Sequence, residues 1–159
     1  MDSGLSLREP RNDEWDRSPF RGETHMHSPS ITGLYLALLA LIYLVLGLQV
    51  SRLRRGNRVL FGDGDNRELR SAIRAHANFA EYVPIIVLMV ALLEISGTPA
   101  LRLHLLMGTL LVARLIHPLG MYVGPRTLQF QICRVGGISL TLVVLLAAAI
   151  MMLLRFWPQ

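Results

Sequence analysis

Four long apolar segments cover most of this chain, and their pattern predicts four helices. Two segments, 31–50 and 135–154, each hold twenty residues without a charge. This is the length that a helix needs to cross about 30 Å of hydrocarbon. Two further segments, 72–95 and 103–123, are also apolar but carry charged side chains and histidines. We therefore predict an all-α integral membrane protein, a bundle of four transmembrane helices.

Turn-forming residues between the apolar segments set the expected ends of the helices. A Ser-Gly-Thr-Pro sequence at 96–99 is a helix stop followed by a short turn, so the second and third helices should form an antiparallel hairpin. Pro118 predicts a kink in the third helix, after Arg114. We expect helices over residues 31–51, 66–95, 100–122 and 129–156.

Residues 1–30 differ in composition from the rest of the chain. They contain three prolines, six acidic residues and four arginines, without apolar periodicity. This composition predicts a disordered tail or an extension, and Met26 offers a second possible start. Residues 31–159 are expected to form one four-helix membrane domain.

All sixteen basic residues are arginine, so the net charge of +5 is fixed at physiological pH. Such a charge suggests nucleic acid for a soluble protein, but here six arginines lie between the first and second apolar segments, which favours membrane lipid as the partner and no nucleic acid. By the positive-inside rule, this connection and the loop with Arg126 are cytoplasmic, and both termini lie on the other side. The six arginines are Arg52, Arg54, Arg55, Arg58, Arg67 and Arg70.

Polar side chains in the second helix predict a site. Arg74, Asn78 and Glu81 stand at i, i+4 and i+7, within roughly 60° of one another around a helix. Ionisable residues within a membrane are rare, and they usually belong to a site. Several arginines with one carboxylate and one amide suit an anionic ligand that also carries an ammonium group. The topology is expected to gather the following residues at one depth: Arg54, Arg55, Arg74, Asn78, Glu81, Arg114, His117 and Arg134.

Two other chemistries are not expected. The single cysteine, Cys133, excludes a disulfide within the chain. His76 and His104 have no matching set of ligands around them in the sequence, so no metal site is predicted.

The second-helix residues resemble a known family pattern. Arg74-Ala-His-Ala-Asn78-Phe-Ala-Glu81-Tyr82-Val-Pro84 is similar to the signature of the membrane-associated proteins in eicosanoid and glutathione metabolism, the MAPEG family. Leu48-Gln49-Val50, the pair Arg54-Arg55 and then Arg58-Val59 resemble the end of the first helix in its leukotriene synthase branch. The Arg-x-x-His-Pro run at 114–118 resembles the bacterial, uncharacterised branch. The resemblance spans residues 31–156.

The resemblance implies a homotrimer in a bacterial inner membrane, with glutathione bound between neighbouring subunits at the cytoplasmic side. It implies that Arg74, Asn78, Glu81 and Tyr82 hold the tripeptide, with His76 at a position where some members have glutamine. Arg114 and His117 match a third-helix arginine and a ligand-contacting tyrosine. Arg134 matches the arginine that activates the glutathione thiol, with an insertion in the loop 123–132.

Simpler roles remain open for the same residues. Arg74, Asn78 and Glu81 are also suited to an ion pair and hydrogen bond that lock the second helix to a neighbour. The arginines at 52–58 are suited to setting topology and binding lipid headgroups, with Arg54 or Arg55 also contacting ligand. Arg134 is equally suited to reaching headgroup phosphates, and His117 to lining a pocket or to bonding a carbonyl at the kink.

The leading hypothesis for function is a glutathione-dependent transferase or peroxidase acting on lipophilic electrophiles from the bilayer, with Arg134 as the catalytic residue. Its rival is a non-catalytic membrane protein of the same fold that binds lipid or scaffolds a partner. A small transporter is less well supported, because no acidic residue lies in the middle of the first or fourth apolar segment.

Overall fold

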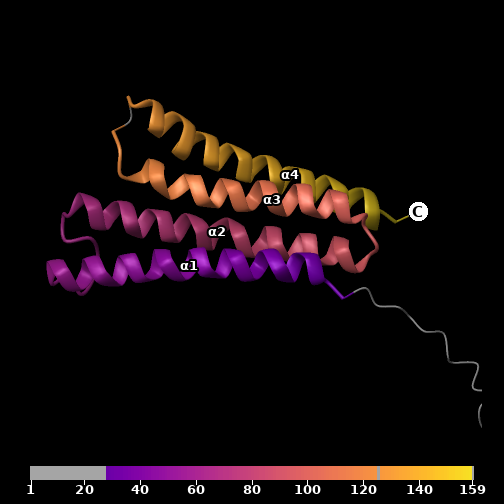
Figure 1. Cartoon of the computed structure of the whole chain (residues 1–159), viewed down its shortest axis with the longest axis horizontal. Helices are drawn as coiled ribbons and strands as arrows, with labels where there is room; N and C mark the ends of the chain where they lie inside the picture. The colour runs from indigo at the N-terminus through magenta and orange to yellow at the C-terminus, as the bar shows by residue number, and fades with distance from the viewer. Residues whose placement is uncertain (1–27, 125, 159) are drawn as a thin grey trace, which may run out of the picture.

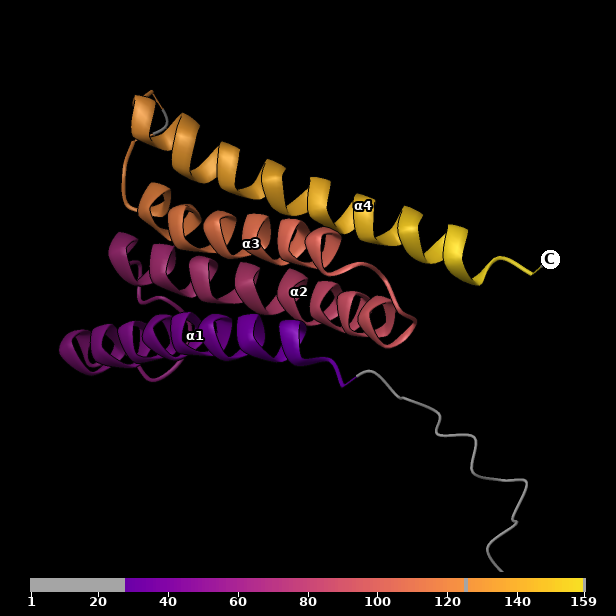
Figure 2. The same cartoon turned by 45° about the vertical axis from the view of Figure 1, so that its right-hand side comes forward.

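The computed structural model describes residues 28–124 and 126–158, which form an elongated bundle of antiparallel helices (Figure 1). In Figure 1 and Figure 2 the four long helices follow one another from bottom to top in chain order, and the first also contacts the third and the second the fourth, so that they form a bundle. Each of the four helical segments described is long and apolar enough to cross a membrane. The predicted all-α, four-helix architecture is therefore confirmed. The helices are α1 (Ser30–Asn57), α2 (Arg67–Ile95), α3 (Ala100–Ile116) and α4 (Gly137–Phe156).

The ends of α2 agree with the prediction, whereas the other helices differ from it. The side chain of Asn66 accepts the backbone N–H of Leu69 at 2.9 Å and so caps the start of α2. Helix α1 continues to Asn57, beyond the expected end at residue 51. The apolar segment ends at residue 50, but the arginines and the leucine that follow are good helix formers, so the helix continues past the hydrocarbon.

Pro118 ends the α-helix instead of kinking it. Proline has no N–H to donate, and the chain from His117 to Met121 tightens into a 3-10 turn after α3 ends at Ile116. A π-helical turn, Phe130–Gly136, precedes α4. The irregularity predicted at Pro118 is thus a 3-10 turn and not a kink, whereas the predicted helical segment 129–156 is observed, with a π-helical first part.

Helix α1 packs against α2 and α3, and α2 also packs against α4. Apolar side chains fill the space between the helices, and many leucines on the outer faces of α1 and α4 are exposed, as expected where lipid surrounds a bundle. Between membrane helices close packing, and not exclusion of water, provides most of the attraction. Fully buried core residues include Leu39, Ile86, Val90, Met107, Leu110 and Ala148.

The first and last described residues lie at one end of the bundle, and the loops that follow α1 and precede α4 lie at the other (Figure 1). The arginine-rich connection and the loop with Arg126 are therefore at the same end, as the predicted topology requires. Most of the tail predicted for residues 1–30 lies outside the described residues.

Candidate functional site

A buried arginine joins three helices. Arg114 of α3 is 1% exposed; its Nη1 donates to Oδ1 of Asn78 on α2 at 2.9 Å, and its Nη2 donates to the hydroxyl of Thr141 on α4. The Thr141 hydroxyl in turn donates to the carbonyl of Gly137 at 2.9 Å. A buried guanidinium is costly unless its donors are bonded, and here only Nε lacks a partner among the described residues. Arg114 is therefore a polar link between α2, α3 and α4.

Thr141 was not found by sequence reasoning. A lone threonine in an apolar helix has no distinctive signal, because its hydroxyl is usually bonded to the carbonyl four residues earlier. Its second contact, with Arg114, depends on how α3 and α4 pack.

Asn78 turns toward α3, away from the outer face of α2. At 100° per residue, Arg74 and Glu81 lie within about 20° of each other, and Asn78 lies about 40° from Arg74. Arg74 and Glu81 are exposed, whereas Asn78 is half-buried with its oxygen bonded to Arg114. Because Oδ1 of Asn78 accepts from Arg114, the orientation of the amide is fixed, and its Nδ2 group is available as a donor.

Arg74 and Glu81 are not in an ion pair with any residue that the structure describes. Of the structural lock considered for Arg74, Asn78 and Glu81, the hydrogen bond is formed by Asn78, and the ion pair is not formed among the described residues. Glu81 lies nine residues inside the predicted segment 72–95, which is about 13 Å along the helix. An uncovered carboxylate at that depth in hydrocarbon is costly.

His117 connects the end of α3 to the beginning of the fourth helix. It is 5% exposed, and its Nδ1 lies 3.1 Å from the backbone oxygen of Arg134. Because a carbonyl oxygen only accepts, Nδ1 carries the proton and donates. The approach is close: a Cβ at Gly137 would lie 2.8 Å from Cβ of His117. His117 therefore bonds a carbonyl, as one alternative proposed, but the carbonyl belongs to the next helical segment and not to a kink.

The side chain of Arg134 is exposed, and its guanidinium carbon lies 5.2 Å from the centre of the Phe130 ring. This cation–π contact leaves the guanidinium N–H groups available. The structure thus fixes the backbone of Arg134 through His117 and leaves the charged group at the surface.

The remaining predicted residues belong to α1 and α2. His76 stacks on Tyr43 with ring centres 4.5 Å apart, and Tyr82 packs against the core. Arg54 is half-buried and its Nη1 donates to the carbonyl of Leu60 at 3.2 Å, whereas Arg55 is exposed.

The predicted site residues do not gather at one depth. Two contacts fix the antiparallel register of α1 and α2: Thr32 with Glu94, and Tyr43 with His76. In this register Glu81 is level with about residue 41 of α1. Arg54 lies about thirteen residues further along α1, or about 20 Å. The expectation of a single depth was wrong for Arg54 and Arg55, whereas Asn78 and Arg114, which are joined by a hydrogen bond, lie at one level. The set forms a series from Arg54 and Arg55 at the end of the bundle to Glu81 nearest its middle.

At the opposite end of the bundle, Glu94 has a structural role that sequence reasoning missed. It is 6% exposed, and its two carboxylate oxygens accept the backbone N–H groups of Ile31 and Thr32, each at 2.8 Å. These donors belong to the first turn of α1, which has no side-chain cap of its own. A carboxylate satisfies such free N–H groups and also interacts favourably with the positive end of the helix dipole. Glu94 therefore caps α1 from α2.

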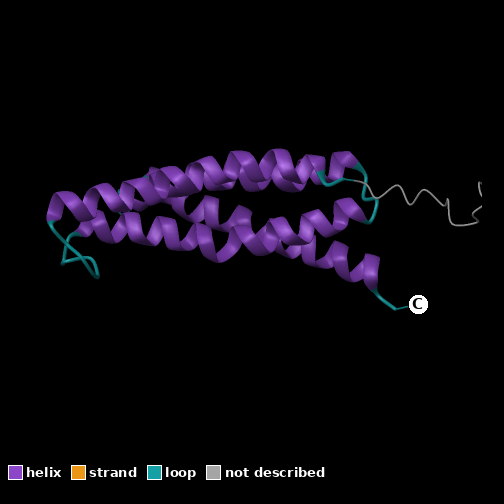
Figure 3. Ribbon diagram, turned by 90° about the horizontal axis from the view of Figure 1, so that it is seen from below, coloured by secondary structure: helices purple, strands orange, loops and turns teal. Residues whose placement is uncertain are grey.

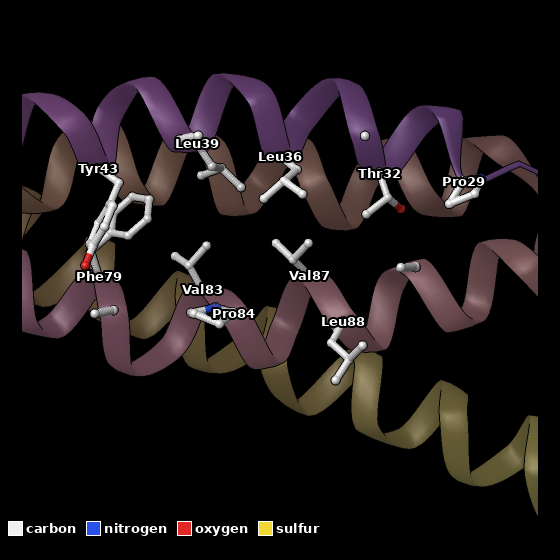
Figure 4. Close-up of a pocket in the computed structure, with 14 residues that line it drawn as sticks. Pro29, Thr32, Leu36, Leu39, Tyr43, Phe79, Val83, Pro84, Val87 and Leu88 are labelled. Carbon is white, nitrogen blue, oxygen red and sulfur yellow. The ribbon is translucent and has the colours of Figure 1, made fainter.

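An apolar groove of about 610 Å³ runs between α1 and α2 (Figure 4). It extends from Pro29 near the start of α1 to Tyr43 and Phe79. Figure 4 shows Leu36, Leu39 and Tyr43 on one wall and Val83 and Val87 on the other. Its walls suit an acyl chain or another apolar molecule. Within the residues that the structure describes, no three His, Cys, Asp or Glu side chains gather as a metal site would require.

Comparison with known proteins identifies the family. The MAPEG family profile matches residues 32–154, which is most of the chain. This chain belongs to the MAPEG family. It is similar to the inner membrane protein YecN of Escherichia coli strain K12, with 38% identity over 92 residues, 58% of this chain and 70% of YecN. YecN of Escherichia coli O6:H1 strain CFT073 matches to the same extent. No solved structure matches the chain.

The family, the inner-membrane relative and the four spans agree on location. The chain is a multi-pass integral protein of a bacterial inner membrane, and its resemblance to the bacterial branch of the MAPEG family is confirmed.

Proposed function

We propose that this MAPEG protein is a glutathione-dependent transferase or peroxidase that acts on lipophilic electrophiles from the bilayer. One observation carries the proposal: Arg74 and Glu81 are exposed within a membrane span, beside an Asn78 amide whose orientation is fixed. Opposite charges without partners inside a span are expected where a charged ligand binds. Membership of a family named for glutathione metabolism supports the choice of ligand.

The chemistry of glutathione fits these groups. The tripeptide carries two carboxylates, one ammonium group and one thiol. In the proposed complex the Arg74 guanidinium binds a carboxylate through two parallel N–H groups, Asn78 donates through Nδ2, and Glu81 accepts the ammonium. His76 and Tyr82 form part of the wall, and Arg54 and Arg55 contribute positive charge at the shallow end of the site.

We further propose that the working unit is a homotrimer, in which neighbouring copies complete each site. The exposed Arg74 and Glu81 support this arrangement, because a neighbouring subunit would remove them from lipid. Arg134, also exposed, is then available to a ligand shared between subunits.

Arg134 is proposed to activate the thiol. The thiolate is the nucleophile, and a nearby guanidinium stabilises it; lowering a thiol pKa by one to two units corresponds to about 1.4 to 2.7 kcal/mol. In the transferase reaction, the thiolate sulfur forms a bond to an electrophilic carbon, and the displaced group leaves with the electron pair. In the peroxidase reaction, the thiolate attacks an oxygen of a hydroperoxide, the O–O bond breaks, and the alkoxide takes a proton and leaves as an alcohol. A second glutathione then attacks the sulfenic acid that has formed, which gives the disulfide and water.

Arg114 and His117 take positioning roles in this proposal. Arg114 holds the Asn78 amide, and His117 holds the backbone of Arg134, so neither has to touch the ligand. Both are buried, which favours this assignment over direct contact.

Titration of the detergent-solubilised protein with glutathione tests the proposal, with the thiolate absorbance recorded in parallel. We expect binding and a thiolate signal in the wild type, weakened binding in Glu81→Gln, and retained binding without the thiolate signal in Arg134→Ala. Absence of glutathione binding by the folded wild-type protein would refute the proposal.

A second candidate is a non-catalytic protein that binds lipid or scaffolds a partner. The apolar groove between α1 and α2 is the observation in its favour. Glutathione binding without a thiolate signal in the wild type, together with lipid that remains bound through purification, would support this alternative over catalysis.

A further inference from the structure

The loop between α1 and α2, residues 58–66, displays two large apolar side chains at its surface. Leu60 is 85% exposed and Phe61 is 91% exposed. They are adjacent in sequence and lie among charged and turn-forming residues. A neighbouring leucine and phenylalanine with this much exposure in one loop indicate an interaction surface.

The loop is held in shape by polar contacts. Arg70 of α2 forms ion pairs with Asp63 and with Asp65, the latter at 3.4 Å. The hydrogen bond from Arg70 holds the pKa of the Asp63 carboxyl below its usual value, so this pair stays charged at neutral pH. Asn66 also donates from its side chain to that of Asn57 at 3.0 Å. The exposure of Leu60 and Phe61 is therefore a property of a defined loop conformation.

Gly64 contributes to that conformation. Its φ is +54°, and a Cβ at this position would lie 2.6 Å from a methyl carbon of Val59. Only glycine fits both conditions, so the chain turns tightly here and packs against Val59.

The loop folds back beside α1 and does not extend the helix axis. Val59 donates its backbone N–H to the carbonyl of Arg54 at 3.0 Å, and Arg54 donates to the carbonyl of Leu60 at 3.2 Å. Figure 3 shows this loop projecting sideways from the end of the bundle. Leu60 is thus level with Arg54, four residues beyond the apolar segment 31–50, or about 6 Å along the helix.

This height corresponds to the lipid headgroups. The hydrocarbon core is about 30 Å thick and the whole bilayer about 40 to 45 Å, which leaves about 5 to 7 Å of headgroup region on each side. Apolar side chains displayed sideways at this level enter the boundary between headgroups and acyl chains, where interfacial segments bury their apolar groups.

The charges around the two side chains fit the same surface. Several exposed arginines surround them. Within the described part of the chain, these arginines take part in no ion pair. Guanidinium groups bind lipid phosphates well. Within residues 52–70, the exposed arginines outside ion pairs are Arg52, Arg55, Arg58 and Arg67, whereas Arg70 is exposed but paired with Asp63 and Asp65.

We propose that Leu60 and Phe61 form an interfacial anchor that inserts into the cytoplasmic leaflet, with the surrounding arginines bound to anionic headgroups. The anchor fixes the cytoplasmic ends of α1 and α2 relative to the membrane surface. It does not depend on glutathione binding. An anionic leaflet is favoured over a second copy of the chain, because residues 52–70 carry six arginines against three acidic residues, and this positive excess would repel the same segment of a neighbour.

The test places an environment-sensitive dye at position 61 of the full chain, using Phe61→Cys in a Cys133→Ala background. Both positions lie outside the buried core, so the protein is expected to fold. The protein is reconstituted into vesicles that contain phosphatidylglycerol and lipids brominated near the glycerol end of the acyl chain. We expect a blue-shifted emission, quenching by the brominated lipid, and protection from aqueous iodide.

Two matched comparisons isolate the charge contribution. Replacing phosphatidylglycerol with phosphatidylcholine should reduce the quenching by brominated lipid, and so should the double variant Arg52→Gln with Arg55→Gln in anionic vesicles. Gly64→Val, which disrupts the turn but keeps Leu60 and all four arginines, should also reduce it.

Two results would overturn the proposal. The first is a dye at position 61 that iodide quenches freely and brominated lipid does not, which would place the loop in water. The second is rapid disulfide formation between unlabelled Phe61→Cys subunits in vesicles, which would identify a second copy as the partner.

Discussion

Helix α2 carries two glutamates thirteen residues apart whose environments are opposite. Glu94 is buried and accepts two backbone N–H groups of α1, so the chain satisfies it internally. Glu81 is exposed inside the span, and none of the described residues forms an ion pair with it. Because the residue type is the same, the difference comes from helix packing, which gives Glu94 two backbone donors and leaves Glu81 exposed.

The arginines divide in the same way. Arg114 is fully buried and links α2 to α4, whereas the side chain of Arg134 is exposed and only its backbone is held. The internal members, Glu94 and Arg114, should therefore affect stability, and the exposed members, Glu81 and Arg134, should affect ligand binding.

The largest effect is expected from Arg114→Leu. This change leaves the oxygen of Asn78 and the hydroxyl of Thr141 without their donor, and the two losses together should lower the free energy of unfolding by about 3 kcal/mol. Unfolding of the purified protein in mixed micelles with increasing denaturing detergent measures this. A variant as stable as the wild type would show that Arg114 does not link the helices.

Glu94→Gln should lower stability by about 1 to 2 kcal/mol, because the amide retains one acceptor and turns an NH₂ group toward the second backbone N–H. Glu81→Gln, the matched control on the same helix, should stay within about 0.5 kcal/mol of the wild type. The same detergent titration compares the two variants. Equal losses would remove the distinction between the two acids.

For ligand binding, the relative effects of the two glutamate substitutions are expected to be reversed. Glu81→Gln should weaken glutathione binding about tenfold, equivalent to about 1.4 kcal/mol, because the ammonium of the ligand loses its charged acceptor. Glu94→Gln should leave the affinity unchanged where the protein remains folded. Calorimetric titration of both variants measures the dissociation constants, and an unchanged affinity in Glu81→Gln would contradict the proposed ligand contact.

The smallest effect is expected from Thr141→Val, which keeps the shape of the side chain and removes its hydroxyl. Hydrogen bonds between membrane helices contribute about 0.6 to 2 kcal/mol, and Arg114 keeps its bond to Asn78, so a loss of about 1 kcal/mol is expected. Thr109→Val, on the half-buried face of α3 away from this link, is a suitable control. A larger loss in the control than in Thr141→Val would argue against the link.

The sequence predicted the spans and the limits of α2 because both depend on local composition. Twenty uncharged residues are enough to define a span, and Asn66 caps its helix through a residue three positions away. It failed where one element acts on another. Glu94 caps a helix more than sixty residues away in sequence, and no local pattern reports that contact.

The candidate site follows the same division. The spacing of Arg74, Asn78 and Glu81 indicated a site on α2, and the matching family pattern indicated glutathione, which remains a proposal. The sequence did not indicate that Asn78 would turn toward Arg114, because the 40° difference in angle matters only once α3 lies on that side.

The sequence alone determined the four membrane-spanning helices, because the cost of placing charge and free backbone groups in hydrocarbon restricts what such a chain can form. The pattern from Arg74 to Pro84 carried the resemblance to the MAPEG family, which the family profile confirmed. Tertiary structure alone decided which polar groups are used internally. In a low-dielectric interior every buried charge needs a partner at hydrogen-bond distance, and that distance is set by the register and rotation of packed helices. Arg114 and Glu94 have hydrogen-bond partners within the chain, and Glu81 forms no ion pair with the residues that the structure describes.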